Sequence, residues 1–205
     1  MNMIEKTLSL YCVKYAHSVL PKKAIFKGEA SEEKLPITFC IYLVQAEDKN
    51  ILVDAGCDSM PSFDMKEFYS PAFVLRQVGL SSDEIPDVII THAHHDHIEA
   101  VKHFRNATIH ISEEAYLKGK KHIPNEMNTR LFIEEYAIHP LVRIIKWGGH
   151  AIGSAIVEIK GKEKTHVLAG DEIYTNDCIA QKIPTGSSYN EAQSIAFIEK
   201  SIFFS

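Results

Sequence analysis

Short runs of apolar and β-branched residues recur along the chain, and each has the length of a β-strand. We expect strands at residues 8–13, 39–44, 51–53, 88–90, 108–111, 142–146, 155–159, 166–168 and 202–204. Between these runs, apolar residues recur at the spacing of an amphipathic helix. We expect helices at residues 64–78, 98–104, 112–117, 127–136 and 191–200. Ser112 and Asn190 stand at the start of two of these helices and are typical N-cap residues.

The order of these elements predicts an α/β fold. Consecutive strands come first, strands then alternate with helices, and a second set of consecutive strands occupies residues 141–169. Such an order favours two β-sheets that pack together and are flanked by helices on their outer faces. No internal repeat or low-complexity linker divides the chain, so we expect residues 1–205 to form a single domain.

Composition and charge limit the classes of partner. With 45% hydrophobic and 24% charged residues, the chain lies in the range of ordinary globular proteins. The net charge is −5 and no long block of Lys or Arg occurs, which argues against binding to nucleic acid or to an anionic membrane. We therefore expect a small-molecule partner, and the sequence leaves a homodimer open.

The cysteines and the N-terminal residues indicate the compartment. The four cysteines are scattered without a C-x-x-C pair, which favours neither a disulfide framework nor a thiolate zinc site. Residues 1–10 contain no continuous apolar stretch, and no apolar run is long enough to cross a bilayer. These features predict a soluble, cytoplasmic protein with reduced thiols.

A histidine-rich segment at residues 91–97, Thr-His-Ala-His-His-Asp-His, follows one of the apolar strands. Residues two apart in an extended segment project to the same side, so His92 and His94 can share one metal ion. Asp96 and His97, at the turn into the next helix, then point at a neighbouring position. Imidazole and carboxylate together suit zinc, manganese or iron, and a ligand set without cysteine leaves room for water. The alternative interpretation is a histidine-rich loop that only faces solvent.

The pattern T-H-x-H-x-D-H after an apolar strand resembles the signature of the metallo-β-lactamase superfamily. Three further segments resemble that family. They are an early strand that ends in Asp54, a glycine-flanked histidine at His150, and a strand that ends in Asp171. The resemblance extends from about Phe39 to the end of the chain. It implies an αβ/βα sandwich, with the active site at the mouth between the two sheets and with Asp54 supporting the site from behind.

The resemblance also implies six metal ligands and zinc as the cofactor, as one or two ions, with manganese or iron as alternatives. The first metal would be held by His92, His94 and His150, the second by Asp96 and His97, and Asp171 would join them. Taken alone, His150 would more often be a loop histidine and Asp171 an exposed turn residue, and it is the histidine-rich motif that favours the ligand role for both. We expect His95 to point away from the metals.

One further match, Asp-Glu-Ile-Tyr at residues 171–174, resembles the N-acyl homoserine lactonases. In that family a tyrosine three residues after the bridging aspartate hydrogen-bonds the substrate carbonyl, which implies this role for Tyr174. The alternative is that Tyr174 only packs. Phe63, Phe68 and Tyr69 fall in the segment that lines the acyl pocket of such enzymes, and they are equally compatible with a plain core.

The implied reaction is hydrolysis of an ester-like carbonyl, with a lactone as the favoured substrate. A metal-bound hydroxide would attack the carbonyl carbon, because a bound metal lowers the pKa of water towards about 7. Tyr174 would donate to the developing oxyanion, and Asp96 would pass a proton to the leaving alkoxide. A thioester hydrolase of the glyoxalase II kind would use the same steps. A relative that binds metal without turnover is the alternative from another class.

The sequence departs from the family at two places. Relatives often have two glycines soon after the Asp-His pair, where this chain has Ile-Glu-Ala at residues 98–100. The family also supplies one more histidine to the second metal after a last helix and a short strand. Here the helix at residues 191–200 and the strand at residues 202–204 are followed only by Ser205. We expect the domain to be incomplete at its C-terminal end and its second metal to bind more weakly than the first.

Overall fold

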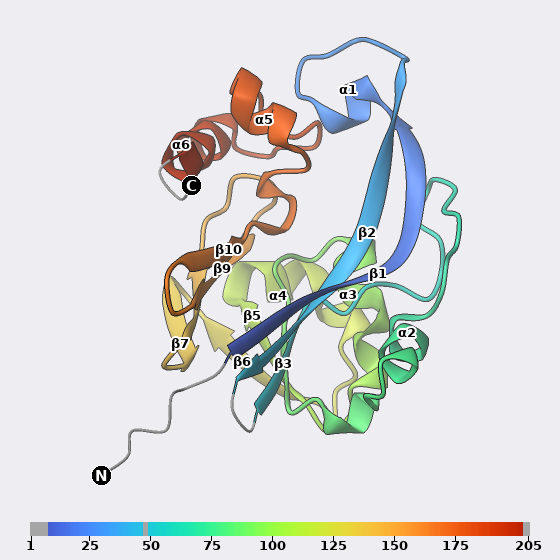
Figure 1. The fold of residues 1–205 in the computed structure, drawn as a ribbon, viewed down its shortest axis with the longest axis vertical. Helices are drawn as coiled ribbons and strands as arrows, with labels where there is room; N and C mark the ends of the chain where they lie inside the picture. Colours follow the sequence, from blue (N-terminus) through green and yellow to red (C-terminus); the bar gives the residue numbers. More distant parts are fainter. Residues whose placement is uncertain (1–7, 47–48, 203–205) are drawn as a thin grey trace.

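The computed structural model describes residues 8–46 and 49–202, and within them two β-sheets pack together (Figure 1). The larger sheet has the strand order β1-β2-β3-β4-β5-β6. Its strands are Leu8–Pro21, Lys34–Ala46, Lys49–Val53, Asp87–Ile89, Thr108–Ser112 and Asn128–Phe132. The pairs β1-β2 and β2-β3 are antiparallel, whereas β3, β4, β5 and β6 run parallel to one another. The carboxyl ends of these parallel strands therefore meet at one edge of the sheet.

Strands β1 and β2 form a long antiparallel ribbon that extends beyond the rest of the larger sheet (Figure 1). The register shifts between Lys14 and Ala16, and such a bulge bends a strand and increases its twist. The ribbon continues to the pair of Pro21 with Lys34, and the short helix α1, Lys22–Ile25, follows directly. The ribbon and α1 thus build a wall above the edge where the parallel strands end.

The smaller sheet is antiparallel throughout and has the strand order β10-β9-β8-β7. Its strands are, from β7 to β10, Glu135–His139, Val142–Lys146, Ala155–Lys160 and Thr165–Leu168. Buried aliphatic side chains from both sheets meet in one cluster, with Ile51 and Ile89 from the larger sheet and Ile144 and Val157 from the smaller. This apolar layer holds the sheets together, because its burial removes a large aliphatic surface from water.

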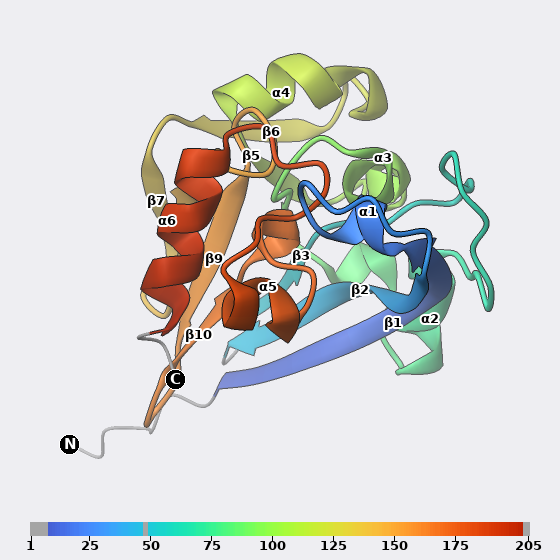
Figure 2. The same ribbon diagram turned by 90° about the horizontal axis from the view of Figure 1, so that it is seen from above.

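Helices cover the outer face of each sheet. The helices after α1 are α2 Pro71–Gln77, α3 His95–Ile98, α4 Glu113–Gly119, α5 Asn176–Gln181 and α6 Glu191–Ser201. The 3₁₀ helices are η1 Ser82–Glu84, η2 Glu99–His103, η3 Lys120–His122 and η4 Gly170–Glu172. Leu75, Ile98 and Ala115 bury against the larger sheet from α2, α3 and α4. Figure 2 shows α6 along the smaller sheet, where the rings of Trp147 and Phe197 lie 5.1 Å apart.

The layered arrangement confirms the α/β sandwich expected from the order of the elements. The two N-cap predictions are also confirmed, since Ser112 accepts a hydrogen bond from the backbone N–H of Ala115 and Asn190 accepts one from that of Gln193. No helix among the residues that the structure describes is long and apolar enough to span a bilayer.

The helix expected at residues 127–136 is wrong, because these residues form β6 and the start of β7. Strand β6 pairs in parallel with the open edge of β5, which offers backbone hydrogen bonds along its whole length. Two of the apolar residues in this segment are on the surface, with Leu131 and Ile133 exposed by 42% and 62%, so the segment has no buried helical face. Pairing at the sheet edge outweighs a weak helical period.

Two other predicted helices are shorter than expected. Within residues 64–78 the helix begins only at Pro71, since proline disfavours a helical residue before it and suits the first helical position. Residues 98–104 contain the end of α3 and the 3₁₀ helix η2 instead of a continuous α-helix. The predicted strand at residues 202–204 begins at Ile202, which lies in a 3₁₀ turn, and its other residues lie outside the described part of the chain.

Candidate metal centre

Parallel pairing of β3 and β4 brings Asp54 beside the start of the histidine-rich segment. Asp54 follows β3 directly and has a left-handed backbone conformation, with φ of 62°, which aspartate tolerates better than most residues. Its carboxylate accepts hydrogen bonds from the backbone N–H of Thr91 at 2.8 Å and from the Thr91 hydroxyl at 2.9 Å. These bonds fix the direction in which the chain leaves β4 and enters the segment.

Three imidazole nitrogens and a carboxylate oxygen converge beyond this edge, and we call them the first cluster. Nδ1 of His94 lies 3.0 Å from Nε2 of His92 and 3.0 Å from Nε2 of His150. Oδ2 of Asp171 lies 3.7 Å from Nε2 of His92 and 3.4 Å from Nε2 of His150. All four residues offer ligand atoms within 4.8 Å of one another, which is close enough to surround one ion.

Two threonine hydroxyls set the tautomers of the buried histidines in the first cluster. A threonine hydroxyl has a single hydrogen to donate. The Thr91 hydroxyl donates to Asp54, so at 3.1 Å it accepts from Nδ1–H of His92. The Thr185 hydroxyl donates to the backbone carbonyl of Asp171 and accepts from Nδ1–H of His150, both at 3.1 Å. Each histidine therefore presents an Nε2 lone pair to the centre of the cluster.

The donor set of the first cluster fits a transition metal. The Nε2 lone pairs of His92 and His150 both point at Nδ1 of His94, where a single N–H can satisfy only one of them. Burial lowers the pKa values of His92 and His94, and it lowers that of His150 to about 4, so the neutral, metal-binding form is favoured. Neutral imidazoles with one carboxylate are a typical zinc ligand set.

A second group of donors, which we call the second cluster, lies next to the first and shares Asp171. Oδ1 of Asp171 lies 3.1 Å from Nε2 of His97, and Oδ2 of Asp96 lies 3.8 Å from the same nitrogen. Nδ1 of His97 donates to Oδ2 of Asp54 at 2.8 Å. The two oxygens of Asp171 thus face different clusters, as a carboxylate that joins two ions must.

The electrostatics of the second cluster favour positive charge. Burial lowers the pKa of His97, but the nearby carboxylates outweigh it and hold that pKa well above 6.5. Burial raises the pKa of Asp171, but the facing histidines, His97 above all, hold it well below 3.8. Three carboxylates, those of Asp54, Asp96 and Asp171, surround the single imidazole of His97. This excess of carboxylates is suited to a cation.

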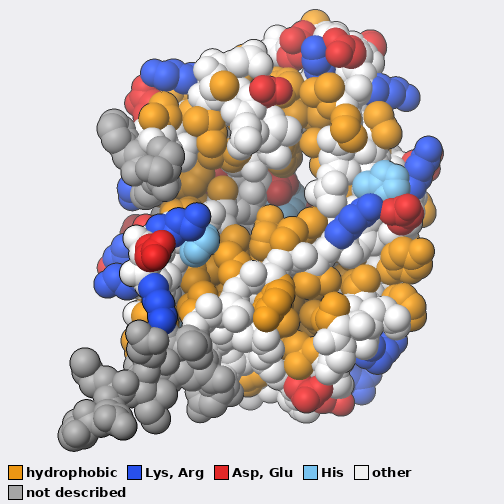
Figure 3. Space-filling view, in the orientation of Figure 1, with side chains coloured by type: hydrophobic (Ala, Val, Ile, Leu, Met, Phe, Trp, Pro, Cys, Tyr) orange, Lys and Arg blue, Asp and Glu red, His pale blue; other side chains and the backbone are white. Residues whose placement is uncertain are grey.

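A cavity of about 720 Å³ opens above both clusters. Figure 3 shows this face hollowed, with acidic and histidine side chains inside the hollow and hydrophobic side chains around it. His94, Asp96, His97 and Asp171 line the cavity floor. Its apolar wall comes from the β1-β2 ribbon, α1, the segment between β3 and α2, and the segment after β10. The side chains are those of Leu20, Ile25, Ile37, Phe39, Phe63 and Ile173. The cavity can therefore hold a molecule with a polar head at the clusters and an apolar tail.

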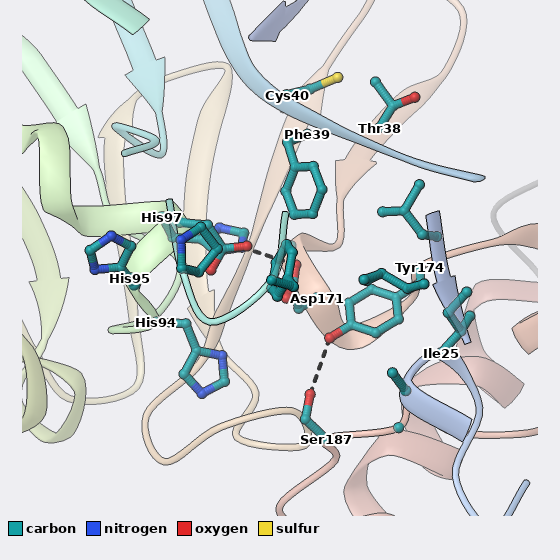
Figure 4. A pocket seen from close by; sticks show the side chains of 18 of the residues that line it. Ile25, Thr38, Phe39, Cys40, His94, His95, His97, Asp171, Tyr174 and Ser187 are labelled. Atoms are coloured by element: carbon teal, nitrogen blue, oxygen red, sulfur yellow. Dashed lines mark hydrogen bonds and ion pairs between the residues drawn. The ribbon is translucent and has the colours of Figure 1, made fainter. Parts of the chain in front are cut away.

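Tyr174 stands at the cavity wall close to the first cluster. Figure 4 shows its ring beside Asp171, and its hydroxyl lies 3.1 Å from the hydroxyl of Ser187. The rings of Tyr174 and His150 lie 5.9 Å apart. Burial raises the pKa of Tyr174 far above its usual value, so the phenol keeps its proton at neutral pH. Tyr174 can therefore donate a hydrogen bond to a molecule in the cavity.

The model of one protein family, described as the metallo-beta-lactamase superfamily, matches residues 41–199. The chain belongs to this superfamily. Its relatives within the superfamily include the N-acyl homoserine lactonase AiiB of Agrobacterium fabrum (strain C58 / ATCC 33970), which is 23% identical over 188 residues that cover 73% of this chain and 68% of the relative. The N-acyl homoserine lactonase of Bacillus thuringiensis is 22% identical over 228 residues, which cover 95% of this chain and 91% of the relative.

Solved structures share the superfamily fold with this chain. An N-acyl homoserine lactone hydrolase with the product N-hexanoyl-L-homoserine at its catalytic metal centre matches with a TM-score of 0.81 and 19% identity, over 95% of this chain and 87% of its own. AidC, a dizinc quorum-quenching lactonase, matches with a TM-score of 0.74 and 18% identity, over 97% of this chain and 85% of its own. The αβ/βα sandwich expected from the sequence is thus confirmed.

The structure brings together the six residues that the superfamily motifs suggested as ligands. The three aromatic residues that the sequence suggested for an acyl pocket have different surroundings. Phe63 lines the cavity, Phe68 packs against the core of the larger sheet, and Tyr69 is half exposed and stacks on Phe73. His95 turns its Nε2 to the backbone carbonyl of Ser59, 2.8 Å away, and so lies outside both clusters.

Three further residues contact the clusters and were not expected from the sequence. Thr185 bonds His150, Glu172 bonds the backbone of the loop that carries His150, and the Tyr15 hydroxyl donates to the backbone carbonyl of Asp96 at 2.8 Å. Thr185 and Tyr15 come from segments far away in the sequence, so no local pattern marks them. Glu172 follows Asp171 directly, and its position in a mostly apolar stretch is the one signal that the sequence offers.

Proposed function

We propose that this chain is a metal-dependent hydrolase that opens the ring of a lactone, with N-acyl homoserine lactones as the substrate class. The observation that carries the proposal is the convergence of His92, His94, His150 and Asp171 beside a cavity with an apolar wall, whose floor includes His94 and Asp171. The relatives support it, since the curated proteins that align with up to 95% of this chain are named N-acyl homoserine lactonases.

The ligand set that we propose for the first ion is His92, His94, His150 and Asp171, and for the second ion Asp96, His97 and the shared Asp171. Zinc is the metal that we propose, because the donors suit it and because the similar lactonase AidC is described as a dizinc protein. Manganese and iron are alternatives that the same donors accept. When bound, the metal lowers the pKa of a coordinated water and polarises the substrate carbonyl.

Two side chains of the cavity then complete the reaction. Tyr174 keeps its proton and donates a hydrogen bond to the carbonyl oxygen as negative charge develops there. Burial raises the pKa of Asp96 above 3.8, which suits a carboxyl group that takes up a proton from the attacking water and passes it to the leaving alkoxide. The aliphatic and aromatic wall of the cavity removes an acyl chain from water and orients the lactone head towards the clusters.

The proposal is tested by a substrate panel on metal-reconstituted protein. N-acyl homoserine lactones with short and long acyl chains, a simple γ-lactone and an acyl thioester are each incubated with the protein and with chelator-treated protein. We expect metal-dependent opening of the acyl homoserine lactones at the highest kcat/KM. Faster cleavage of the thioester would favour a hydrolase of the glyoxalase II kind. Absence of turnover on the whole panel by protein with bound metal would favour a non-catalytic metal-binding relative.

Three expectations from the sequence stay predictions alongside this proposal. They are the cytoplasmic location, the homodimer and the single domain over residues 1–205. The substrate class proposed above is a small molecule, in line with the partner that the net charge of −5 suggested.

A further inference from the structure

A buried carboxylate next to the clusters, that of Glu172, has no part in the chemistry described so far. Its side chain is 1% exposed and extends under the loop that carries His150. We propose that Glu172 is a positioning residue that holds this loop so that Nε2 of His150 reaches the metal. The inference rests on the proposed metal-dependent function, because it concerns the affinity of the first cluster for its ion.

One oxygen of Glu172 collects three hydrogen bonds from the His150 loop. Oε1 accepts from the backbone N–H of Gly149 at 3.1 Å, from that of His150 at 3.0 Å, and from the hydroxyl of Ser154 at 2.6 Å. The first two donors are the consecutive backbone N–H groups that lead up to the Cα of His150, and the third, Ser154, lies on the other side of the turn. Glu172 thus fixes the backbone of His150, while Thr185 fixes its imidazole ring.

The two glycines before His150 allow the loop to approach the carboxylate of Glu172. A Cβ atom added to Gly149 would lie 2.3 Å from Oε2 of Glu172 and 2.7 Å from the Ser194 hydroxyl, so only glycine allows the approach. Gly148, with φ of 84°, has a left-handed conformation that lets the chain turn into the loop. Close approach to Glu172 therefore accounts for one glycine of the Gly-Gly-His sequence, and the turn accounts for the other.

The position of Glu172 along the chain couples the loop to the metal site. Glu172 and Asp171 are adjacent in the 3₁₀ helix η4, and Asp171 contributes an oxygen to each cluster. The single turn η4 therefore carries both Asp171, which faces the two clusters, and Glu172, which holds the loop of His150. Any shift of η4 relative to the loop changes the distance between Asp171 and His150, which is now 3.4 Å from Oδ2 to Nε2.

A role in stability alone is a weak explanation for a carboxylate at this place. Burying a carboxyl group costs free energy, and a well-packed apolar side chain often stabilises a core equally well. Oε2 has no hydrogen-bond partner among the described residues, which adds to that cost. Oε1 instead orients the loop, because the backbone N–H groups of Gly149 and His150 and the hydroxyl of Ser154 must all point at this one oxygen.

The experiment compares Glu172→Gln with Glu172→Met. The glutamine oxygen can accept the same three hydrogen bonds, whereas methionine fills the space without accepting any. Glu158→Met is the matched control, because Glu158 is a partly buried carboxylate on β9 that pairs with Arg143 on the surface. For each variant the zinc affinity is measured by competition with a chelating dye, and the absorption spectrum of the cobalt-loaded protein reports the ligand geometry. Unfolding of the metal-free protein is followed in parallel.

We expect Glu172→Met to bind the tighter zinc ion about 10- to 100-fold more weakly, the range known for residues that orient metal ligands. Its cobalt spectrum should change, while Glu172→Gln and the control stay within about threefold of the unaltered protein. If Glu172→Met does not fold, Gly149→Ala tests the same contact from the loop side and should weaken zinc in the same way. Unchanged zinc affinity and cobalt spectrum in folded Glu172→Met, or in folded Gly149→Ala if that variant replaces it, would overturn the inference. Failure of the unaltered protein to bind zinc would instead overturn the proposed function.

Discussion

The hydroxyl of Thr185 lies 3.1 Å from Nδ1 of His150 and fixes which nitrogen of that imidazole carries the hydrogen. Because the same hydroxyl donates to the backbone carbonyl of Asp171, it can only accept from His150. Nε2 of His150 is then left with a lone pair that faces His94 and Asp171. A residue 35 positions away in the sequence thus prepares a candidate metal ligand.

Thr185→Val should weaken the tighter metal site, because it removes the acceptor for Nδ1–H of His150 while keeping the shape of the side chain. Loss of such an orienting partner costs about 10- to 100-fold in metal affinity. Thr185→Ser keeps the hydroxyl and should bind within a few-fold of the unaltered protein. Competition with a chelating dye measures both. Equal affinity of the valine and serine variants would show that the hydroxyl does not orient His150.

Four of the six candidate ligands could be predicted from the sequence itself, because the pattern at residues 91–97 is local. His92, His94, Asp96 and His97 all leave one strand, so their proximity follows from chain geometry alone. His150 and Asp171 were found only through resemblance to superfamily motifs. Contacts such as that of Thr185 with His150 depend on how distant segments fold together, and no pattern of residue types encodes them.

The helices and strands likewise differ in whether a local sequence pattern could predict them. Buried central strands such as β4 were predicted, since an apolar run of this kind fits a parallel strand covered on both faces. Strand β6 was missed because its residues are mostly exposed and its hydrogen bonds come from β5, which the sequence of β6 does not reveal. The start of α2 at Pro71 could have been predicted, since proline is a typical first residue of a helix. The apolar spacing over residues 64–78 instead suggested a longer helix.

Tyr174→Phe should lower kcat/KM for a lactone by roughly tenfold to a thousandfold, the range for loss of one donor to a developing oxyanion. The effect should fall mainly on kcat, since the donor matters most in the transition state. Zinc affinity is the control and should not change, because Tyr174 belongs to neither cluster. An unchanged kcat/KM on the best lactone would assign Tyr174 to packing alone.

The pKa of His150 predicts how the stability of the metal-free protein depends on pH. That pKa is about 4 in the folded chain, against 6.5 for an ordinary histidine. Between these values the unfolded chain binds a proton that the folded chain does not, so the contribution of His150 to stability falls as pH falls from 6.5 to 4. The slope for one such proton is about 1.4 kcal/mol per pH unit. Above pH 6.5 the contribution of His150 is constant.

Denaturant unfolding in chelator at several pH values measures this contribution as the difference between the unaltered protein and His150→Gln. We expect the free energy of unfolding of the unaltered protein to fall relative to that of the variant as pH is lowered through the window. A difference that stays constant from pH 7 to pH 4 would show that His150 is not held neutral by burial.

The position of the bound metal tests most directly the claim that the first cluster is the metal centre. Crystals of the zinc-loaded protein are measured at wavelengths on either side of the zinc absorption edge, and anomalous difference maps locate the ion. We predict the strongest peak about 2.0–2.2 Å from Nε2 of His92, Nδ1 of His94 and Nε2 of His150, with an Asp171 oxygen at a similar distance. A strongest peak away from these atoms, in crystals shown to contain zinc, would contradict the account.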